Sequence, residues 1–444
     1  MIAQFAFYAT KIVRGLLKMS ERLKQLLANR KQSCANRGIY SVCSAHPWVL
    51  RAALQQAKAD GSLLLIEATS NQVNQFGGYT RMQPVDFYRL VLNLAQTEQF
   101  PSEALILGGD HLGPNPWQHM PSEEAMAHAE AMVAAYAAAG FTKLHLDASM
   151  PCADDPAVLS DAIVARRAAR LCLAAERAAP GAALVYIIGT EVPTPGGATE
   201  GLGHMHVTTK EAAHQTIEVH HRVFAEHGLT GVWPRVIAVV VQPGVEFNHD
   251  SVVFYQPDKA TELVSLLADY APLMFEAHST DYQLPSGYRE LVRDGFAILK
   301  VGPALTFAMR EALFALAEIE AALISAQAQS HLVDVIDDAM LRKPKDWARH
   351  YEGTPEEQAV LRRFSYSDRI RYYWNEPEVI QAVERLLTNL KKKPIPETLI
   401  SAYLPEQYRR LRIKLPTLQP EDFVLDRIRQ ALEPYADACT APQE

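Results

Sequence analysis

Short apolar segments recur along the chain, and a stretch with helical periodicity follows each of them. Most of the segments are continuously apolar rather than alternating, which is typical of parallel strands that are covered on both faces. The stretches between them, such as Glu123–Ala139 and Ile163–Ala178, are rich in Ala and predict helices. The predicted strands are Ile39–Cys43, Leu63–Glu67, Ala104–Leu107, Lys143–Leu146, Leu184–Ile188, Arg235–Val241, Leu273–Glu276 and Phe296–Val301.

Eight strand–helix units, spaced roughly 30 to 50 residues apart, are typical of a (β/α)8 barrel. We therefore predict a TIM barrel over residues 37–328 in which the first and eighth strands pair. A doubly wound open sheet is the alternative. No GxGxxG motif follows the first strand, and polar clusters follow nearly every strand, so the barrel is favoured.

The pattern changes after Pro303, where Ala304–Ala328 predicts one long helix, either the eighth barrel helix or its extension. The sequence beyond it has no strand signal. We predict a helical C-terminal region over residues 329–444, with Pro near several helix starts. Its predicted helices are Leu332–Met340, Pro355–Arg363, Pro377–Leu390 and Pro420–Tyr435.

Residues 1–36 form an N-terminal extension whose apolar start precedes Lys11 and Arg14, the reverse of the order in a signal peptide. The extension is either a docked helix or a membrane-surface helix. Alternatively the natural start is Met19, with Ser20 capping a helix over Glu21–Ala28. No apolar run approaches the roughly 20 residues that span a bilayer, so we expect no membrane partner.

Composition narrows the class of protein further. The 444 residues are 48% hydrophobic and 21% charged, which excludes intrinsic disorder, collagen and coiled coil. The net charge of −8, from 43 basic and 51 acidic residues without a basic patch, argues against nucleic acid. Five Cys without a CxxC pair suit a reducing cytoplasm and argue against disulfides or structural zinc.

Polar side chains gather where the predicted strands end, which is where barrel enzymes carry their chemistry. Burying so many of them is costly unless they are paired or bind a ligand. We therefore predict a catalytic or binding site at this end of the barrel. The candidates are Ser44, His46, Glu67, Asn71, Asp110, His111, Asp147, Ser149, Glu191, Gln242, His278, Ser279, Asp281 and Lys300.

Asp110 and His111 are the most specific pair, because adjacent residues can place an imidazole on a metal and a carboxylate beside it for proton transfer. The alternative is a His that bonds a backbone carbonyl. His278 supplies a second imidazole, and Glu191 or Gln242 would add oxygen ligands. Such a set suits Zn²⁺, Mn²⁺, Co²⁺ or Ni²⁺ better than Mg²⁺. The metal prediction requires the two imidazoles to lie within about 5 Å of each other.

Further candidate residues would bind a polyol or a phosphate. The turns at Gly77–Gly78 and Gly196–Gly197 either let the backbone approach such a ligand or are tight βα turns. Lys300 is placed to neutralise a phosphate. The motif SDRIRYYW either arches over the barrel mouth or packs on the barrel flank. Its candidate side chains are Arg369, Arg371, Tyr372 and Tyr373.

These strand ends resemble the class II aldolase superfamily. The resemblance assigns Asp110 as the general acid, His111 as the first metal His and His278 as the last. Asp147 with Ser149, Glu191 with Gly196 and Gly197, and the KVG of residues 300–302 at the phosphate-binding eighth strand match as well. The sequence departs at Gln242, where the aldolases carry their middle metal His.

Longer motifs resemble the GatZ/KbaZ family, the so-called non-catalytic subunits of class II D-tagatose-1,6-bisphosphate aldolase. The resemblance runs from about residue 38 to the C-terminus. The motifs are CSAHP (43–47), LIEATSNQVNQFGGYT (65–80), ILGGDHLGPN (106–115), LHLDASM (144–150), VVQPGVEF (240–247), EAHSTDYQ (276–283), ILKVGPALTF (298–307) and SDRIRYYW (367–374).

This resemblance implies a cytoplasmic protein of galactitol and N-acetylgalactosamine catabolism that supports a separate catalytic subunit. It leaves an alternative open, because some members are similar to ketohexose 4-epimerases that interconvert fructose and tagatose. Retro-aldol cleavage between C3 and C4 followed by re-addition would achieve that inversion with aldolase parts. A sugar-binding module without chemistry is a third alternative. The sequence does not choose between a free ketose and a ketose phosphate, nor between a monomer and a homo-oligomer.

Overall fold

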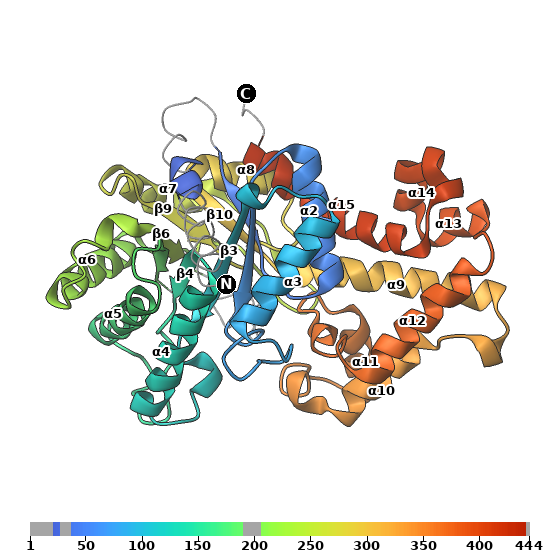
Figure 1. Ribbon diagram of the computed structural model, residues 1–444, viewed down its shortest axis with the longest axis horizontal. Coiled ribbons are helices and arrows are strands. Elements are labelled where there is room, and N and C mark those ends of the chain that lie inside the picture. Colours follow the sequence, from blue (N-terminus) through green and yellow to red (C-terminus); the bar gives the residue numbers. More distant parts are fainter. Residues whose placement is uncertain (1–20, 27–36, 190–205, 441–444) are drawn as a thin grey trace, which may run out of the picture.

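The computed structural model describes residues 21–26, 37–189 and 206–440. Eight parallel strands close into a barrel in the order β1-β10-β9-β6-β5-β4-β3-β2 (Figure 1). The barrel strands are β1 (Ile39–Val42), β2 (Leu64–Thr69), β3 (Leu105–Leu112), β4 (Lys143–Leu146), β5 (Val185–Ile188), β6 (Val236–Val241), β9 (Met274–Ala277) and β10 (Phe296–Val301).

Closure of the barrel depends on the pairing of its first and last strands. Ile39 pairs with Ile298 and Val42 with Val301, in parallel register. The predicted (β/α)8 barrel is therefore confirmed. The first residue of each observed strand lies within two residues of the first residue of a predicted strand. An additional hairpin, β7 (Glu246–Phe247) with β8 (Val252–Val253), lies outside the barrel and was not expected from the sequence.

Helices cover the barrel wall between successive strands (Figure 1). Several begin with Pro in the first turn, where its missing N–H costs nothing, and three end at a Gly with positive φ. The wall helices are α2 (Pro47–Asp60), α3 (Pro84–Thr97), α4 (Ser122–Ala139), α5 (Asp161–Ala178), α6 (Lys210–Glu226), α7 (Pro257–Ser265) and α8 (Pro285–Asp294), and α9 (Pro303–Leu323) follows the last strand.

The last helix, α15 (Pro420–Thr440), packs on the barrel itself, against α2, α8, α9 and β1. The ring of Tyr435 lies 4.0 Å from that of Tyr288 on α8 and 6.3 Å from that of Tyr40 on β1, measured between centroids. The Tyr435 hydroxyl donates to the carbonyl of Thr280 over 2.9 Å. A helix from the C-terminal region thus fills the wall between α8 and α2, while α9 runs outward from the barrel (Figure 1).

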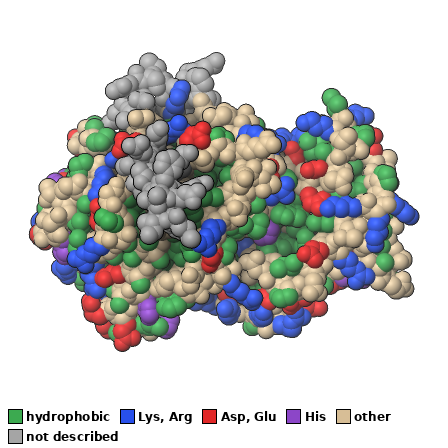
Figure 2. Space-filling view, viewed as in Figure 1, with side chains coloured by type: hydrophobic (Ala, Val, Ile, Leu, Met, Phe, Trp, Pro, Cys, Tyr) green, Lys and Arg blue, Asp and Glu red, His purple; other side chains and the backbone are tan. Residues whose placement is uncertain are grey.

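The other C-terminal helices gather at one end of the molecule's long axis (Figure 1). They confirm the predicted helical extension, whose domain boundary at residue 328 stays a prediction. They are α10 (Leu332–Arg342), α11 (Pro355–Phe364), α12 (Pro377–Lys391), α13 (Glu397–Tyr403) and α14 (Pro405–Leu411). Among the described residues, no helix combines the length and apolar character needed to cross a bilayer. Basic and acidic side chains are interspersed over the face in Figure 2.

Candidate functional site

A β-bulge in β3 brings Asp110 and His111 to the same side of the strand. Neighbouring residues of a regular strand point to opposite faces. The register between β3 and β4 shifts between Gly109 and Leu112, and His111 adopts a positive φ of 47°. Bulges and positive φ at a non-Gly residue are uncommon and concentrate at functional sites, where they redirect side chains. The bulge explains how adjacent residues can serve one site.

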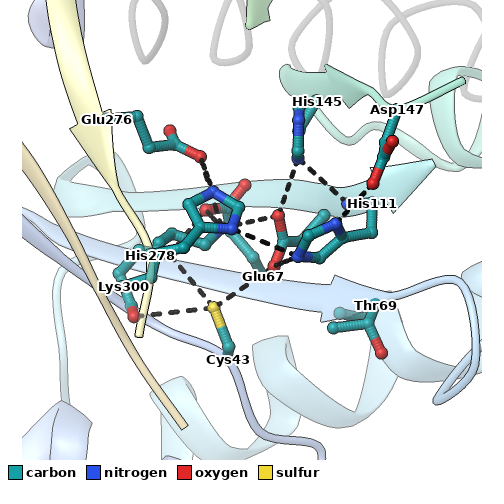
Figure 3. Close-up of polar contacts among 12 residues, drawn as sticks. Cys43, Glu67, Thr69, His111, His145, Asp147, Glu276, His278 and Lys300 are labelled. Carbon is teal, nitrogen blue, oxygen red and sulfur yellow. Dashed lines mark hydrogen bonds and ion pairs between the residues drawn. The ribbon is translucent and has the colours of Figure 1, made fainter. Parts of the chain in front are cut away.

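Four side chains converge at this point, as Figure 3 shows for its three imidazoles. One donor atom from each of Asp110, His111, His145 and His278 lies within 4.8 Å of the others, and all four residues are buried. His111 Nε2 and His278 Nδ1 are 3.2 Å apart. Two nitrogens that each bind one ion at about 2.1 Å are separated by a similar distance.

Carboxylates fix the tautomers of His111 and His278. Asp147 Oδ2 lies 2.6 Å from His111 Nδ1, and Glu276 Oε1 lies 2.9 Å from His278 Nε2. In the neutral rings these nitrogens carry the hydrogen, so the two facing nitrogens present lone pairs to each other. A carboxylate behind a ligating imidazole is the usual second contact in metal sites. The residues therefore fit a divalent cation.

His145 adds a third nitrogen to this cluster. Its Nε2 lies 3.0 Å from the carbonyl of Gly189, which accepts its hydrogen. Its Nδ1 accepts the backbone N–H of His111 over 3.2 Å and lies 3.0 Å from Asp110 Oδ1. An acceptor nitrogen beside a carboxylate oxygen is unfavourable unless a positive charge lies nearby. The Lys300 ammonium, 2.9 Å from Asp110 Oδ1, supplies one such charge, and a proton or a divalent ion between the facing nitrogens would supply another.

A buried charge network lies beneath the cluster, inside the barrel. Lys143 Nζ is 2.8 Å from Glu67 Oε1 and 2.7 Å from Glu276 Oε2. Lys300 contacts Glu67 and lies 2.9 Å from Asp110 Oδ1. Gly108 makes room for this network, because a Cβ there would lie 2.6 Å from Glu67 Oε1. The lysines and carboxylates neutralise one another, as buried charges must.

These contacts shift several pKa values. Burial opposes ionisation of Asp110, but Lys300 and His111 outweigh it and hold its pKa well below the usual range. Burial also disfavours the charged form of His111, yet Asp110 and Asp147 raise its pKa. Burial lowers the pKa of His278 to about 4, so this ring is neutral near pH 7. Without a metal, a proton on His111 would satisfy both facing nitrogens.

The cluster opens into a small cavity of about 100 Å³ at the C-terminal ends of the strands. The loop after β2 and the C-terminal region close its far side, where the rings of Tyr79 and Tyr372 meet edge to face at 4.8 Å. The predicted residues that line it include Ser44, His46, Asn71, Asp110, His111, His278, Ser279, Asp281, Lys300, Arg371 and Tyr372.

Three other predicted residues support the site from behind. Glu67 is fully buried in the charge network. Asp147 orients His111 rather than facing the cavity. Burial alone would raise the pKa of Asp147, but the contact with His111 outweighs burial and lowers this pKa to about 2. Ser149 donates its hydroxyl to Asp147 Oδ1 over 3.0 Å. We therefore correct Asp147 from a catalytic to a positioning role.

Two further predictions need correction. The Gln242 oxygen accepts the backbone N–H groups of Gly244 and Val245 over 2.8 and 3.0 Å, so it holds a turn instead of facing the metal cluster. Arg369 donates to the carbonyl of Asp346 and does not line the cavity. Within SDRIRYYW only Arg371 and Tyr372 reach the mouth. Glu191, Gly196 and Gly197 lie outside the described residues.

The sequence interpretation missed some members of the cluster. His145 and Lys143 lie within β4 rather than after it, and Glu276, the last residue of a predicted strand, was not considered for the site. Charged residues in otherwise apolar strands were the available signal, because such residues are rarely buried without a partner. Cys43, whose Sγ lies 3.7 Å from Asp110 Oδ2 (Figure 3), was passed over as one residue of a motif.

The fold and the site define a (β/α)8-barrel protein with a candidate metal site at the C-terminal ends of its strands. Residues 23–440 match the profile of the family described as D-tagatose-1,6-bisphosphate aldolase subunit GatZ/KbaZ-like. This chain belongs to that family.

Solved structures provide a second comparison. A protein from Sinorhizobium meliloti 1021, described as a probable tagatose 6 phosphate kinase, is 50% identical, with a TM-score of 0.84. The match covers 91% of this chain and 100% of that one. The YdjI aldolase from Escherichia coli K12 is 13% identical over 83% of this chain and 94% of its own, with a TM-score of 0.40. The latter likeness is too distant to carry an argument about the site.

Proposed function

We propose that this chain is a metal-dependent ketose 4-epimerase that works by retro-aldol cleavage and re-addition. The observation that carries the proposal is the pair of facing imidazole nitrogens of His111 and His278, 3.2 Å apart, with Asp110 beside them. A subunit with a purely structural role would gain nothing from such a buried, mutually repelling set of donors. The set is what an aldol reaction on a sugar requires.

The chemistry follows from the position of C4. In a 2-ketose this carbon is not adjacent to the carbonyl, so simple deprotonation cannot invert it. Breaking the bond between C3 and C4 leaves an aldehyde at C4 and an enediolate on the other fragment. Rotation of the aldehyde and renewed attack by C3 on its opposite face inverts C4 with no net change in composition. A bound divalent cation would supply Lewis-acid polarisation of the substrate oxygens.

Asp110 is the group placed to move the proton. Its carboxylate stays ionised, so it accepts the proton of the C4 hydroxyl as the bond between C3 and C4 breaks. The electron pair of that bond passes to C3 and conjugates with the C2 carbonyl. After re-addition, Asp110 returns the proton to the C4 oxygen. The Lys300 ammonium, 2.9 Å from Asp110, holds the carboxylate in place throughout.

The second candidate is the accessory role that the family description favours. As a subunit of class II D-tagatose-1,6-bisphosphate aldolase, the chain would stabilise a catalytic subunit in galactitol or N-acetylgalactosamine catabolism. A homo-oligomer is a further possibility for its assembly. We place the protein in the cytoplasm because its five Cys include no CxxC pair, which suits a reducing compartment, and we take Zn²⁺, Mn²⁺, Co²⁺ or Ni²⁺ as the candidate ions.

The test is to purify the chain alone, supply each ion in turn, and follow fructose, tagatose and their 6-phosphates by chromatography. Formation of the 4-epimer without any partner supports the epimerase. If the epimer never forms, but a class II catalytic subunit becomes more active or more stable when this chain is added, the accessory role replaces it. An added ATP arm tests the kinase activity described for the Sinorhizobium relative.

A further inference from the structure

The N-terminus of α9 is already occupied by a carboxylate. In many barrels a helix N-terminus beside the last strands binds the substrate phosphate through its free N–H groups. Here Asp281 Oδ1 accepts the N–H groups of Gly302 and Ala304 over 3.0 and 2.8 Å. Asp281 is only 2% exposed. Its negative charge stands where a phosphate would bind, so this helix end cannot recognise an anion.

Lys300 is not available for an anion either. Its ammonium contacts Glu67 and lies 2.9 Å from Asp110 and 3.7 Å from Glu276. Three carboxylates around one ammonium leave no net positive charge to offer a substrate. The two features of β10 and α9 that the sequence linked to phosphate are thus both engaged within the protein.

Arg371 is different, because its guanidinium lines the cavity and no described carboxylate oxygen is in ion-pair contact with it, although the charges of Asp281 and Asp368 act on it from further away. Its Nη1 donates to the carbonyls of Ser367 and Asp368, and its Nη2 donates to the Tyr372 hydroxyl over 3.0 Å. Within the part of the chain that the structure describes, no carboxylate oxygen forms an ion pair with it. Neutral acceptors position the group but do not cancel its charge. The contacts to the short turn η8 (Arg369–Tyr372) leave it little freedom to move.

We infer that Arg371 is the anion-recognition residue of this cavity, and that it selects a ketose carrying an acidic group on its terminal carbon. The inference rests on the proposed function for the identity of the sugar. The acidic group is a phosphate ester or a carboxylate, since a guanidinium fork binds both. The C-terminal region then supplies specificity, while the barrel supplies the reacting groups.

The experiment measures binding and turnover of D-tagatose 6-phosphate, the 6-carboxylate D-tagaturonate and uncharged D-tagatose. The variants are Arg371→Met, Arg371→Lys and the control Arg349→Met, which removes the same charge from an exposed position outside the cavity. Isothermal titration gives Kd without turnover, and initial rates separate KM from kcat. Thermal unfolding checks that each variant folds. If Arg371→Met fails to fold, Arg371→Lys still tests the inference, because it keeps the positive charge and removes only the two-pronged hydrogen bonding of the guanidinium.

We expect the wild type to bind one anionic ketose more tightly than D-tagatose, and the tighter anion identifies the acidic group. Arg371→Met should weaken that ligand roughly ten- to hundredfold, mainly in KM, and should weaken D-tagatose much less. The affinity of Arg371→Lys for the anionic ketose should lie between those of the wild type and Arg371→Met, and the affinity of Arg349→Met should match the wild type. Equal binding of charged and uncharged ketoses, or a preference that survives in Arg371→Met, overturns the inference. Absence of epimer with this binding pattern intact overturns only the proposed function.

Discussion

The Nε2 atom of His111 and the Nδ1 atom of His278 face each other at 3.2 Å, and neither carries a hydrogen when both rings are neutral. Asp147 and Glu276 hold the hydrogens on the opposite sides of the two rings. Two lone pairs at this distance repel unless a cation lies between them. Either a proton on His111 or a divalent ion resolves the conflict, so the two compete for one place.

This competition predicts that metal binding releases a proton. The pKa of His111 is raised by Asp110 and Asp147 against the effect of burial, so part of the protein carries that proton near neutral pH. Metal affinity should therefore fall as pH decreases. Isothermal titration with Zn²⁺ in two buffers of different ionisation enthalpy measures the release, which should be less than one proton per ion near neutral pH and should grow as the pH is lowered. Heats that do not depend on the buffer would contradict this prediction.

Asp147→Asn should lower metal affinity without unfolding the protein. An amide cannot anchor the Nδ1 hydrogen of His111 as a carboxylate does, and such changes behind a ligand typically cost roughly ten- to hundredfold in affinity. Ser149→Ala is the matched control, because Ser149 contacts Asp147 but not the ring. Titration with Co²⁺, followed by its visible absorption, gives both affinities. Equal metal affinities for the two variants would show that Asp147 does not support metal binding.

Much of this architecture was predictable, because buried parallel strands are continuously apolar. Lys143–Leu146 and Phe296–Val301 were predicted with their observed bounds. Asp110, His111 and His278 were predictable from their positions at strand ends. The bulge that turns both Asp110 and His111 inward was not, because its cause is the register with β4 and not a local sequence signal.

The predictions for Gln242 and the arginines failed because the direction of each side chain depends on backbone geometry that the sequence pattern does not show. Gln242 resembled a ligand in the sequence, but the backbone N–H groups two and three residues later take its oxygen. Arg369 and Arg371 are close in sequence, and only the turn of η8 decides which faces the cavity. The helix of residues 420–440 has ordinary amphipathic periodicity, which does not reveal that it packs on the barrel wall.

The position of α15 predicts that its buried face stabilises the barrel. Leu432 is fully buried, so Leu432→Ala should lower the free energy of unfolding by about 2–5 kcal/mol. Ile413, which is 98% exposed in the same C-terminal region, is the control, and Ile413→Ala should stay within about 0.5 kcal/mol of wild type. Urea unfolding measures both. A cost below about 1 kcal/mol for Leu432→Ala would mean that α15 contributes little to the barrel.

Stability should fall as the solution is acidified from about pH 6.5 to about pH 4. Burial lowers the pKa of His220 to about 4, whereas the unfolded chain takes up this proton near pH 6.5. Over that window the unfolded state binds more protons, so the free energy of unfolding decreases as pH falls. His220→Phe should make the free energy of unfolding depend less steeply on pH, by an amount that corresponds to at most one proton. His221→Phe, the same substitution at an exposed neighbouring position, is the control, and urea unfolding from pH 7 to pH 4.5 compares both variants with the wild type. If His220→Phe keeps the wild-type slope, its titration does not contribute.

The most direct test of the proposed epimerase is proton NMR of the purified chain with a divalent ion and a ketose or its 6-phosphate in D2O. Retro-aldol cleavage and re-addition move only the hydroxyl proton, so the 4-epimer should appear with the original hydrogens on both C3 and C4. Deuterium at C4 would contradict the mechanism. Absence of the 4-epimer with every candidate ion and substrate would contradict the function itself.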